Sequence, residues 1–169
     1  ITYTSSRIAT HDEIALVHDH AYIASIAATE GKMQRRLDPD TVTSPKSYEA
    51  ACIAAGGVLQ LADMLCASEI RNGFALVRPP GHHAERSRAM GFCLFNNIAI
   101  GARYLEKKHG LGRILIVDFD LHHGNGTQDA FYEDPDVLFI SIHQQDLFPP
   151  VGWGSLDQQG EGAGEGATI

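Results

Sequence analysis

The sequence has few cysteines, no excess of positive charge and no long apolar run. Its three cysteines, Cys52, Cys66 and Cys93, are odd in number and lack metal-type spacing, so we expect buried, reduced thiols in a cytoplasmic protein. The net charge of −8 argues against a nucleic-acid partner, although it does not exclude a cationic substrate. No apolar stretch approaches the roughly 18 residues of a membrane span and no signal peptide is recognisable, so we expect no membrane partner.

Internal repeats and a phosphate-binding glycine fingerprint are also missing. The turn at Gly124–Gly126 is too short for such a fingerprint. The chain has 169 residues, of which 44% are hydrophobic and 20% are charged, which is typical of one globular domain with a substantial core. We therefore treat residues 1–169 as a single domain.

Hydrophobic periodicity predicts alternating helices and strands. Residues 11–29 are expected to form two helical pieces, the second capped by Asp19. Residues 30–46 are polar and are expected to form a surface loop, and the glycine-rich stretch from Gly152 is either a flexible linker or an active-site loop. Further helices are predicted at 47–68, at 96–109 and from Thr127 to Tyr132, and strands at 74–77, 114–117 and 137–142. This order predicts an α/β fold with a parallel sheet.

The stretch from Ile114 to Gly126 has the strongest chemical signal. Four aliphatic residues, Ile114–Val117, are typical of a strand buried on both faces. Asp118, Asp120 and His122 then alternate, which would place them on one face at the carboxyl edge of the sheet. A lone acid there is usually a loop or cap residue, but this alternation of carboxylates and imidazole suits Zn²⁺.

A second pair, His82–His83, follows the strand predicted at 74–77 and a Pro-Pro-Gly turn. Adjacent histidines at a sheet edge suit acid–base catalysis because imidazole titrates near neutral pH. Asp118 is placed to accept a hydrogen bond from one of them and fix its tautomer. Phe92 either lines an apolar entrance or packs in the core. His11, His18 and His20 are interpreted as surface or packing residues.

Three motifs resemble the zinc-dependent histone deacetylase superfamily. They are Arg78-Pro-Pro-Gly-His-His83, Gly91-Phe-Cys93 with Asn96-Asn97, and Val117-Asp-Phe-Asp-Leu-His-His-Gly-Asn-Gly-Thr-Gln128. They are similar to the class II branch and to bacterial deacetylase-like and acetylpolyamine amidohydrolases. The resemblance runs over nearly the whole chain, and it implies an arginase-like three-layer fold around a central parallel sheet. It also implies hydrolysis of an acetyl amide on a lysine side chain, in a peptide or protein, or on a polyamine.

The resemblance also implies residue roles. Asp120 and His122 would ligate zinc, His82 and His83 would be the tandem histidines with His83 as general base and then acid, and Asp118 would orient His82. Gly91 and Phe92 would line the acyl-lysine channel, and Asp40 would grip the substrate backbone at its rim. A structural potassium ion would be bound through Asp118, Asp120, His122, Ser141 and Ile142.

Two of the family's features are not matched in these 169 residues. They are the second aspartate that supplies the third zinc ligand and the tyrosine or histidine loop of the transition state. We therefore expect the sheet to be incomplete at the C-terminal end and the segment alone to be inactive. Asn125 stands where class I enzymes have an aspartate, in agreement with class II.

Other functions of the same residues stay open. A two-manganese ureohydrolase of this fold needs the order Asp-x-His-x-Asp, whereas this chain has Asp118-x-Asp120-x-His122. A non-catalytic acyl-lysine binding module would keep the pocket but not turn over substrate. A polyamine substrate and a protein substrate are not distinguished by these residues.

Overall fold

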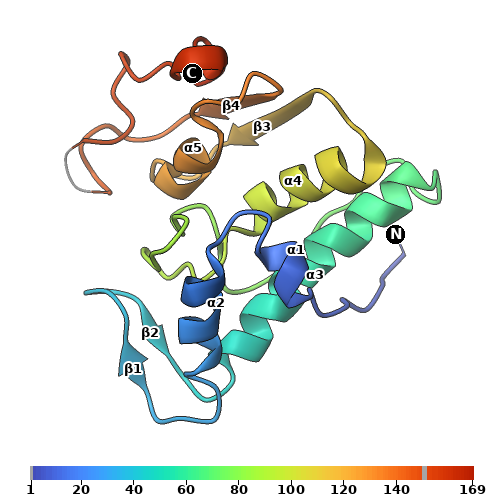
Figure 1. The fold of residues 1–169 in the computed structure, drawn as a ribbon, viewed down its shortest axis with the longest axis vertical. Coiled ribbons are helices and arrows are strands. Elements are labelled where there is room, and N and C mark those ends of the chain that lie inside the picture. The colour runs from blue at the N-terminus through green and yellow to red at the C-terminus, as the bar shows by residue number, and fades with distance from the viewer. Residues whose placement is uncertain (1, 150–151) are drawn as a thin grey trace.

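Helices make up most of the regular structure in the computed structural model, which describes residues 2–149 and 152–169. The helices are α1 (His11–Ile14), α2 (His20–Ala27), α3 (Ser47–Cys66), α4 (Asn97–His109) and α5 (Asn125–Phe131), with a short 3₁₀ helix η1 (Gly162–Gly164). The strands are β1 (Arg35–Arg36), β2 (Val42–Thr43), β3 (Ile114–Asp118) and β4 (Val137–Ser141). Figure 1 shows the β1–β2 hairpin at one end of the molecule and β3–β4 at the other.

The predicted parallel pairing is confirmed for β3 and β4. Their register aligns Ile114 with Val137 and Asp118 with Ser141, so both strands end at the same edge. The last residues of the chain add to the other side of β4: Phe139 donates its N–H to Ala167 O, and Ile169 donates to Phe139 O, each at 2.9 Å. The described residues therefore form a parallel α/β sheet in the order β3, β4, 167–169.

Helices α4 and α5 cover one face of this sheet, and α3 lies on the far side of α4 (Figure 1). The buried side chains between sheet and helices are Ala99, Ala102, Ile116, Phe131, Val137 and Phe139. On the opposite face Leu115 is 59% and Val117 is 45% exposed. The expectation of a strand buried on both faces is therefore wrong for the described residues, because no helix among them packs against that side.

Two further expectations about the sheet need correction. Residues 74–77 do not form a strand: no described residue pairs with them in a sheet, and Phe74 and Leu76 are 84% and 90% exposed. Residues 30–46 do not form a plain loop but contain the antiparallel hairpin of β1 and β2. The hairpin strands are only two residues long, which is too short for a periodic pattern to predict them.

The helix boundaries agree with the prediction better than the caps do. Asp19 is the N-cap of α2, but its side chain makes no capping hydrogen bond and pairs with Arg86 and Ser87 instead. Helix α5 begins at Asn125 after Gly124, so Thr127 lies inside the helix, where its hydroxyl accepts a hydrogen bond from Asn96. Both side chains therefore bond to tertiary partners rather than to the first turn of their own helix.

Helix α3 is long and apolar enough to cross a membrane by length and composition alone, contrary to the sequence expectation. In the structure it packs in the core, with Cys52, Ala55 and Leu59 almost fully buried. Cys66, its last residue, is exposed, so the expectation of a buried thiol is wrong for Cys66 and confirmed for Cys52 and Cys93. The Gly56–Gly57 pair of α3 lies against the N-terminal segment: a Cβ at Gly56 would lie 2.0 Å from Arg7 O. The glycines therefore seat residues 6–9 on α3.

The glycine-rich tail is packed rather than free. Glu161 donates its N–H to Tyr132 O at 2.9 Å, just after α5. A Cβ at Gly164 would lie 2.6 Å from Asp134 N, so η1 lies tightly against the end of the α5 region. The interpretation of this stretch as a flexible linker is wrong for the described residues 152–169.

Candidate functional site at the carboxyl end of β3

The site begins where β3 ends. Asp118 is the last strand residue, and Asp120 and His122 follow on a loop rather than on a strand as predicted. Successive turns bring the three together, because Asp120 N–H donates to Asp118 Oδ1 at 3.1 Å and His122 N–H donates to Asp120 Oδ1 at 2.8 Å. Such Asx turns let a carboxylate satisfy the backbone two residues on. The alternation thus reflects local turns as well as strand periodicity.

The two histidines of the 82–83 turn are held against this loop by the backbone. His82 O accepts hydrogen bonds from Gly126 N–H at 2.9 Å and Thr127 N–H at 3.2 Å, at the start of α5. His82 Nδ1 lies 2.8 Å from Asp118 Oδ2. An ionised carboxylate only accepts hydrogen bonds, so His82 Nδ1 carries the proton. Burial is the largest single influence on Asp118 and opposes its ionisation, but the hydrogen bond and charge interaction with His82 and the hydrogen bond from Asp120 N–H together hold the pKa of the carboxyl below its ordinary value.

His83 is paired with Asn125 rather than with a carboxylate. Its Nδ1 lies 2.9 Å from Asn125 Oδ1, and both side chains are buried. Its ring centroid lies 4.0 Å from that of His82. Burial, followed by the nearby His82, lowers the pKa of His83 to about 4. His83 is therefore neutral at physiological pH, the form that can accept a proton.

Asp120 and His122 bring two metal-binding atoms together. Asp120 Oδ1 and His122 Nδ1 lie 3.1 Å apart, and the side chains are 50% and 39% exposed. Two donors that share a zinc ion at about 2.0–2.2 Å each lie roughly 3–3.5 Å apart, so this pair fits such an ion. Among residues 2–149 and 152–169 no group of three His, Cys, Asp or Glu side chains is placed to hold a metal. The described residues therefore bring only two suitable donor atoms together at this point.

Gly91 and Phe92 form a turn beside His83 in which both residues have left-handed backbone angles, with φ of 55° and 66°. The Phe92 side chain is 58% exposed, which is unlike a core residue. Its N–H donates to Thr41 Oγ1 at 3.0 Å, and the Thr41 hydroxyl donates to Asp40 Oδ1 at 3.0 Å. Asp40 and Phe92 therefore belong to one hydrogen-bonded unit, and both line a cavity of about 390 Å³.

Sequence reasoning missed one aromatic residue of the site, Phe148. Its ring lies edge-on to His83 and His122, with centroid distances of 4.8 and 5.8 Å. A signal was present, because Phe148 stands in a Pro-containing loop shortly after the strand end that carries His143. Phe148 covers the imidazoles and gives the site an apolar wall.

Three of the residues expected to bind potassium meet where β3 and β4 end. Asp118 and Ser141 are paired across β3 and β4, and Ile142 N–H donates to Asp118 O at 2.8 Å. Ser141 Oγ lies 2.9 Å from His143 Nδ1. The structure thus gathers Asp118, Ser141 and Ile142 at one strand end.

The three N-terminal histidines lie as expected for packing or surface residues. His18 is buried, with Nδ1 3.0 Å from Glu85 O and Nε2 accepting a hydrogen bond from Asn96 N–H at 2.9 Å. Burial lowers the pKa of His18 to about 4. His11 and His20 are exposed, with their Nδ1 atoms 3.4 Å apart. None of the three contacts His82, His83 or His122 through a hydrogen bond in the described residues.

Comparison with known proteins gives a consistent result. A histone deacetylase domain model matches residues 1–169. The chain is 45% identical to histone deacetylase 10, chloroplastic, of Oryza sativa subsp. japonica, over 95% of this chain and 38% of that protein. It is 44% identical to polyamine deacetylase HDAC10 of Danio rerio, over 96% of this chain and 26% of that protein.

The crystal structure of the HDA15 HD domain matches with a TM-score of 0.92 and 39% sequence identity, covering 98% of this chain and 47% of that chain. This match identifies the arginase/deacetylase fold. The chain spans less than half the length of each of these three proteins.

Proposed function

This chain belongs to the histone deacetylase family, and we propose that it supplies the catalytic histidines and two zinc ligands of an amidohydrolase that removes acetyl groups from lysine side chains or polyamines. One observation carries the proposal. Two imidazoles, each oriented by a hydrogen-bonding partner, lie beside a carboxylate and an imidazole whose metal-ligating atoms are 3.1 Å apart.

Zinc would be held by Asp120 and His122, with a third ligand supplied from outside these residues. When bound, it would polarise the acetyl carbonyl and lower the pKa of a water molecule. Catalytic zinc sites usually have three protein ligands and an open position. Because Asp120 and His122 are partly exposed, there is room beside them for a third protein ligand and for an open position.

His83 is the proposed general base. Its Nδ1 is engaged by Asn125, which leaves Nε2 as the basic nitrogen. Nε2 takes a proton as water attacks the acetyl carbon, and it returns a proton to the amine that leaves. The proton on His82 Nδ1 stays hydrogen-bonded to Asp118. His82 stabilises electrostatically the negative charge that develops in the transition state. A potassium ion bound through Asp118, Asp120, His122, Ser141 and Ile142 would stabilise the loop that presents these groups.

The substrate is proposed to enter between aromatic side chains. Phe92 is exposed and Phe148 lies over His83 and His122, so both suit the methylene chain of an acyl-lysine or acylpolyamine. Asp40 lies on a cavity that Phe92 also lines. Its carboxylate can bind either the backbone N–H groups of a peptide or the ammonium group of a polyamine.

Three assays on the full-length protein test this function. Acetate release is measured with an acetyl-lysine peptide and with N-acetylputrescine, and urea release with arginine, alongside metal analysis. We expect acetate release, a zinc content near one ion per chain, and loss of activity with a chelator that zinc restores. Urea release with manganese would support a ureohydrolase instead. Binding of the peptide without acetate release would support a non-catalytic module.

A further inference from the structure

The Asn125 side chain lies between His83 and a carboxylate that the proposed mechanism does not use. Asn125 Oδ1 is 2.9 Å from His83 Nδ1, and Asn125 Nδ2 is 2.8 Å from Glu85 Oε1. Asn125 is fully buried, and Glu85 is half-buried. The side chains of His83, Asn125 and Glu85 therefore form one continuous hydrogen-bonded row.

This row determines which way the Asn125 amide points. An ionised carboxylate has no hydrogen to donate, so only the NH₂ end of the amide can face Glu85. The carbonyl end must then face His83, and it can only accept a hydrogen bond. His83 Nδ1 must therefore carry the proton, and Nε2 keeps its lone pair. With the amide reversed, NH₂ would face Nδ1, and the ring proton would move to Nε2.

Glu85 is itself held in place by its neighbours. Its backbone N–H donates to Arg88 O at 3.0 Å, and its carbonyl lies 3.0 Å from Nδ1 of the buried His18. The second Asn125 hydrogen points at weaker acceptors, His83 O at 3.4 Å and Met90 Sδ at 3.5 Å. Glu85 is thus the strongest acceptor that the amide meets, because hydrogen bonds to charged groups exceed those to neutral ones.

We propose that Glu85 is a positioning residue that acts through Asn125 to hold His83 in the tautomer with a basic Nε2. The catalytic consequence rests on the proposed function, since a base with its proton on Nε2 cannot accept another there. The tautomer itself does not depend on that function and can be measured separately.

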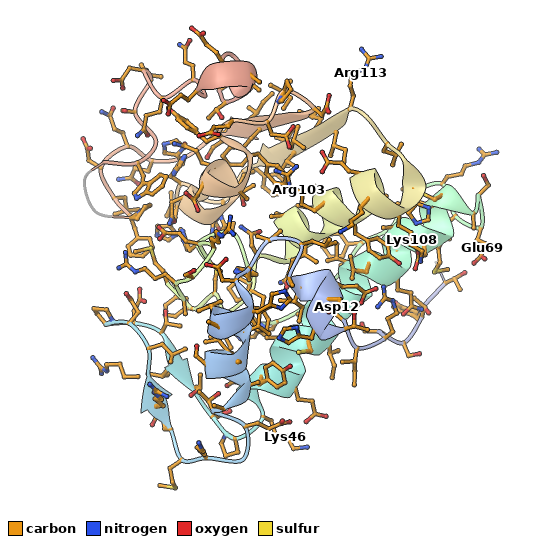
Figure 2. All side chains as sticks on the ribbon, viewed as in Figure 1. Asp12, Lys46, Glu69, Arg103, Lys108 and Arg113 are labelled. Atoms are coloured by element: carbon orange, nitrogen blue, oxygen red, sulfur yellow. The ribbon has the colours of Figure 1, made fainter. Side chains whose placement is uncertain are left out.

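The test compares Glu85→Gln with Glu69→Gln in the full-length protein. Gln has the shape of Glu but can both donate and accept, so it no longer dictates the amide orientation. Glu69 is exposed beyond the C-terminal end of α3, as Figure 2 shows, and controls for loss of one charge. The protein is labelled with ¹⁵N-histidine, and the His83 signals are identified by their absence in His83→Gln. Spectra are recorded with and without zinc, and kcat, KM and zinc content are measured.

We expect wild type and Glu69→Gln to show His83 as one tautomer, with the proton on Nδ1. In Glu85→Gln a population with the proton on Nε2 appears, kcat falls, and KM and zinc content stay unchanged. Glu85→Met, which removes the acceptor, should lower kcat further, by roughly tenfold, about the effect of one net hydrogen bond. If Glu85→Met does not fold, the isosteric Gln variant decides.

Unchanged ¹⁵N signals and unchanged kcat in Glu85→Gln would overturn the proposal. A fall in kcat without a change of tautomer would also contradict it, because Glu85 would then act by another route. If wild type hydrolyses no acetyl amide while the tautomer changes in Glu85→Gln, the positioning role stands and the proposed function fails.

Discussion

Gly91 lies so close to His83 that a Cβ atom at position 91 would fall 2.2 Å from His83 Cδ2. Gly91 also has a φ of 55°, which side-chain-bearing residues rarely adopt. The glycine therefore serves both the turn that presents Phe92 and the close packing of the imidazole. The backbone at this position fixes one side of the His83 ring.

Gly91→Ala is predicted to impair the site more than the fold. The new methyl group must displace the His83 ring, and the left-handed backbone costs roughly 1 kcal/mol more. We expect kcat to fall at least tenfold, an effect of about 1.4 kcal/mol on the barrier. Gly31→Ala is the matched control, because Gly31 has φ of 69° and nothing within 4 Å of its Cβ position. Equal kcat losses in the two variants would show that contact with His83 is not the cause.

Thr41→Val is predicted to raise KM for an acetyl-lysine peptide, and Thr41→Ser to restore it. The buried Thr41 hydroxyl joins Phe92 N–H to the Asp40 carboxylate, and valine leaves that N–H without its acceptor, at a cost of about 1–3 kcal/mol. Thr43→Val is the control, since buried Thr43 bonds to Arg35 O within the hairpin. The account is contradicted if both valine variants change KM equally in steady-state assays.

Protonation of His18 is predicted to destabilise the fold below neutral pH. Burial depresses its pKa from 6.5 to about 4, so between these values the unfolded chain binds the proton and the folded chain does not. The contribution of neutral His18 to the free energy of unfolding is complete above pH 6.5 and is lost as pH falls to 4. This contribution is at most roughly 3 kcal/mol. His83 and His123 are shifted in the same direction and add to the loss.

Urea unfolding at about pH 7 and pH 4.5 measures how much of the loss of folding stability at low pH is due to His18. In His18→Gln the difference in unfolding free energy between the two pH values should be smaller than in wild type. His20→Gln, at an exposed site, should leave that difference unchanged. A pH dependence of His18→Gln equal to that of wild type would exclude a contribution from His18.

The gathering of these residues at one site was predictable from sequence because they lie in two short runs. His82–His83 and the series Asp118, Asp120 and His122 each follow an apolar segment, and the turns within the second run join residues only two apart. Phe148 and Glu85 were not predicted. Their roles depend on contacts across 65 and 40 positions of chain, to His83 and Asn125 respectively, which no local pattern encodes.

The extent of the sheet was less predictable than its edge. Residues 74–77 have a strand-like composition but no partner among the described residues, and β3 has one uncovered face. Pairing and coverage are tertiary properties, whereas a periodic pattern reports only which side chains prefer burial. The short β1–β2 hairpin, conversely, forms where composition indicated only a polar loop.

Asn125→Asp shows how the structure revises a sequence-based prediction. From sequence, a carboxylate behind His83 is expected to raise its pKa and to move the acidic limb of the pH–rate profile to higher pH. The structure places Glu85 Oε1 2.8 Å from Asn125 Nδ2, so the new carboxylate would meet another at short range. We therefore predict the full shift in pH–rate profiles only when Asn125→Asp is combined with Glu85→Gln, and little shift from Asn125→Asp alone.

The central claim is that His83 acts on water and substrate while Asp120 and His122 hold the zinc. The most direct test measures acetate release and bound zinc together, in full-length wild type and in His83→Ala. We predict that the variant keeps the zinc content of the wild type and loses activity by roughly 10²–10⁴-fold, as for removal of a general base. Activity close to that of wild type, or loss of zinc together with activity, would contradict this account.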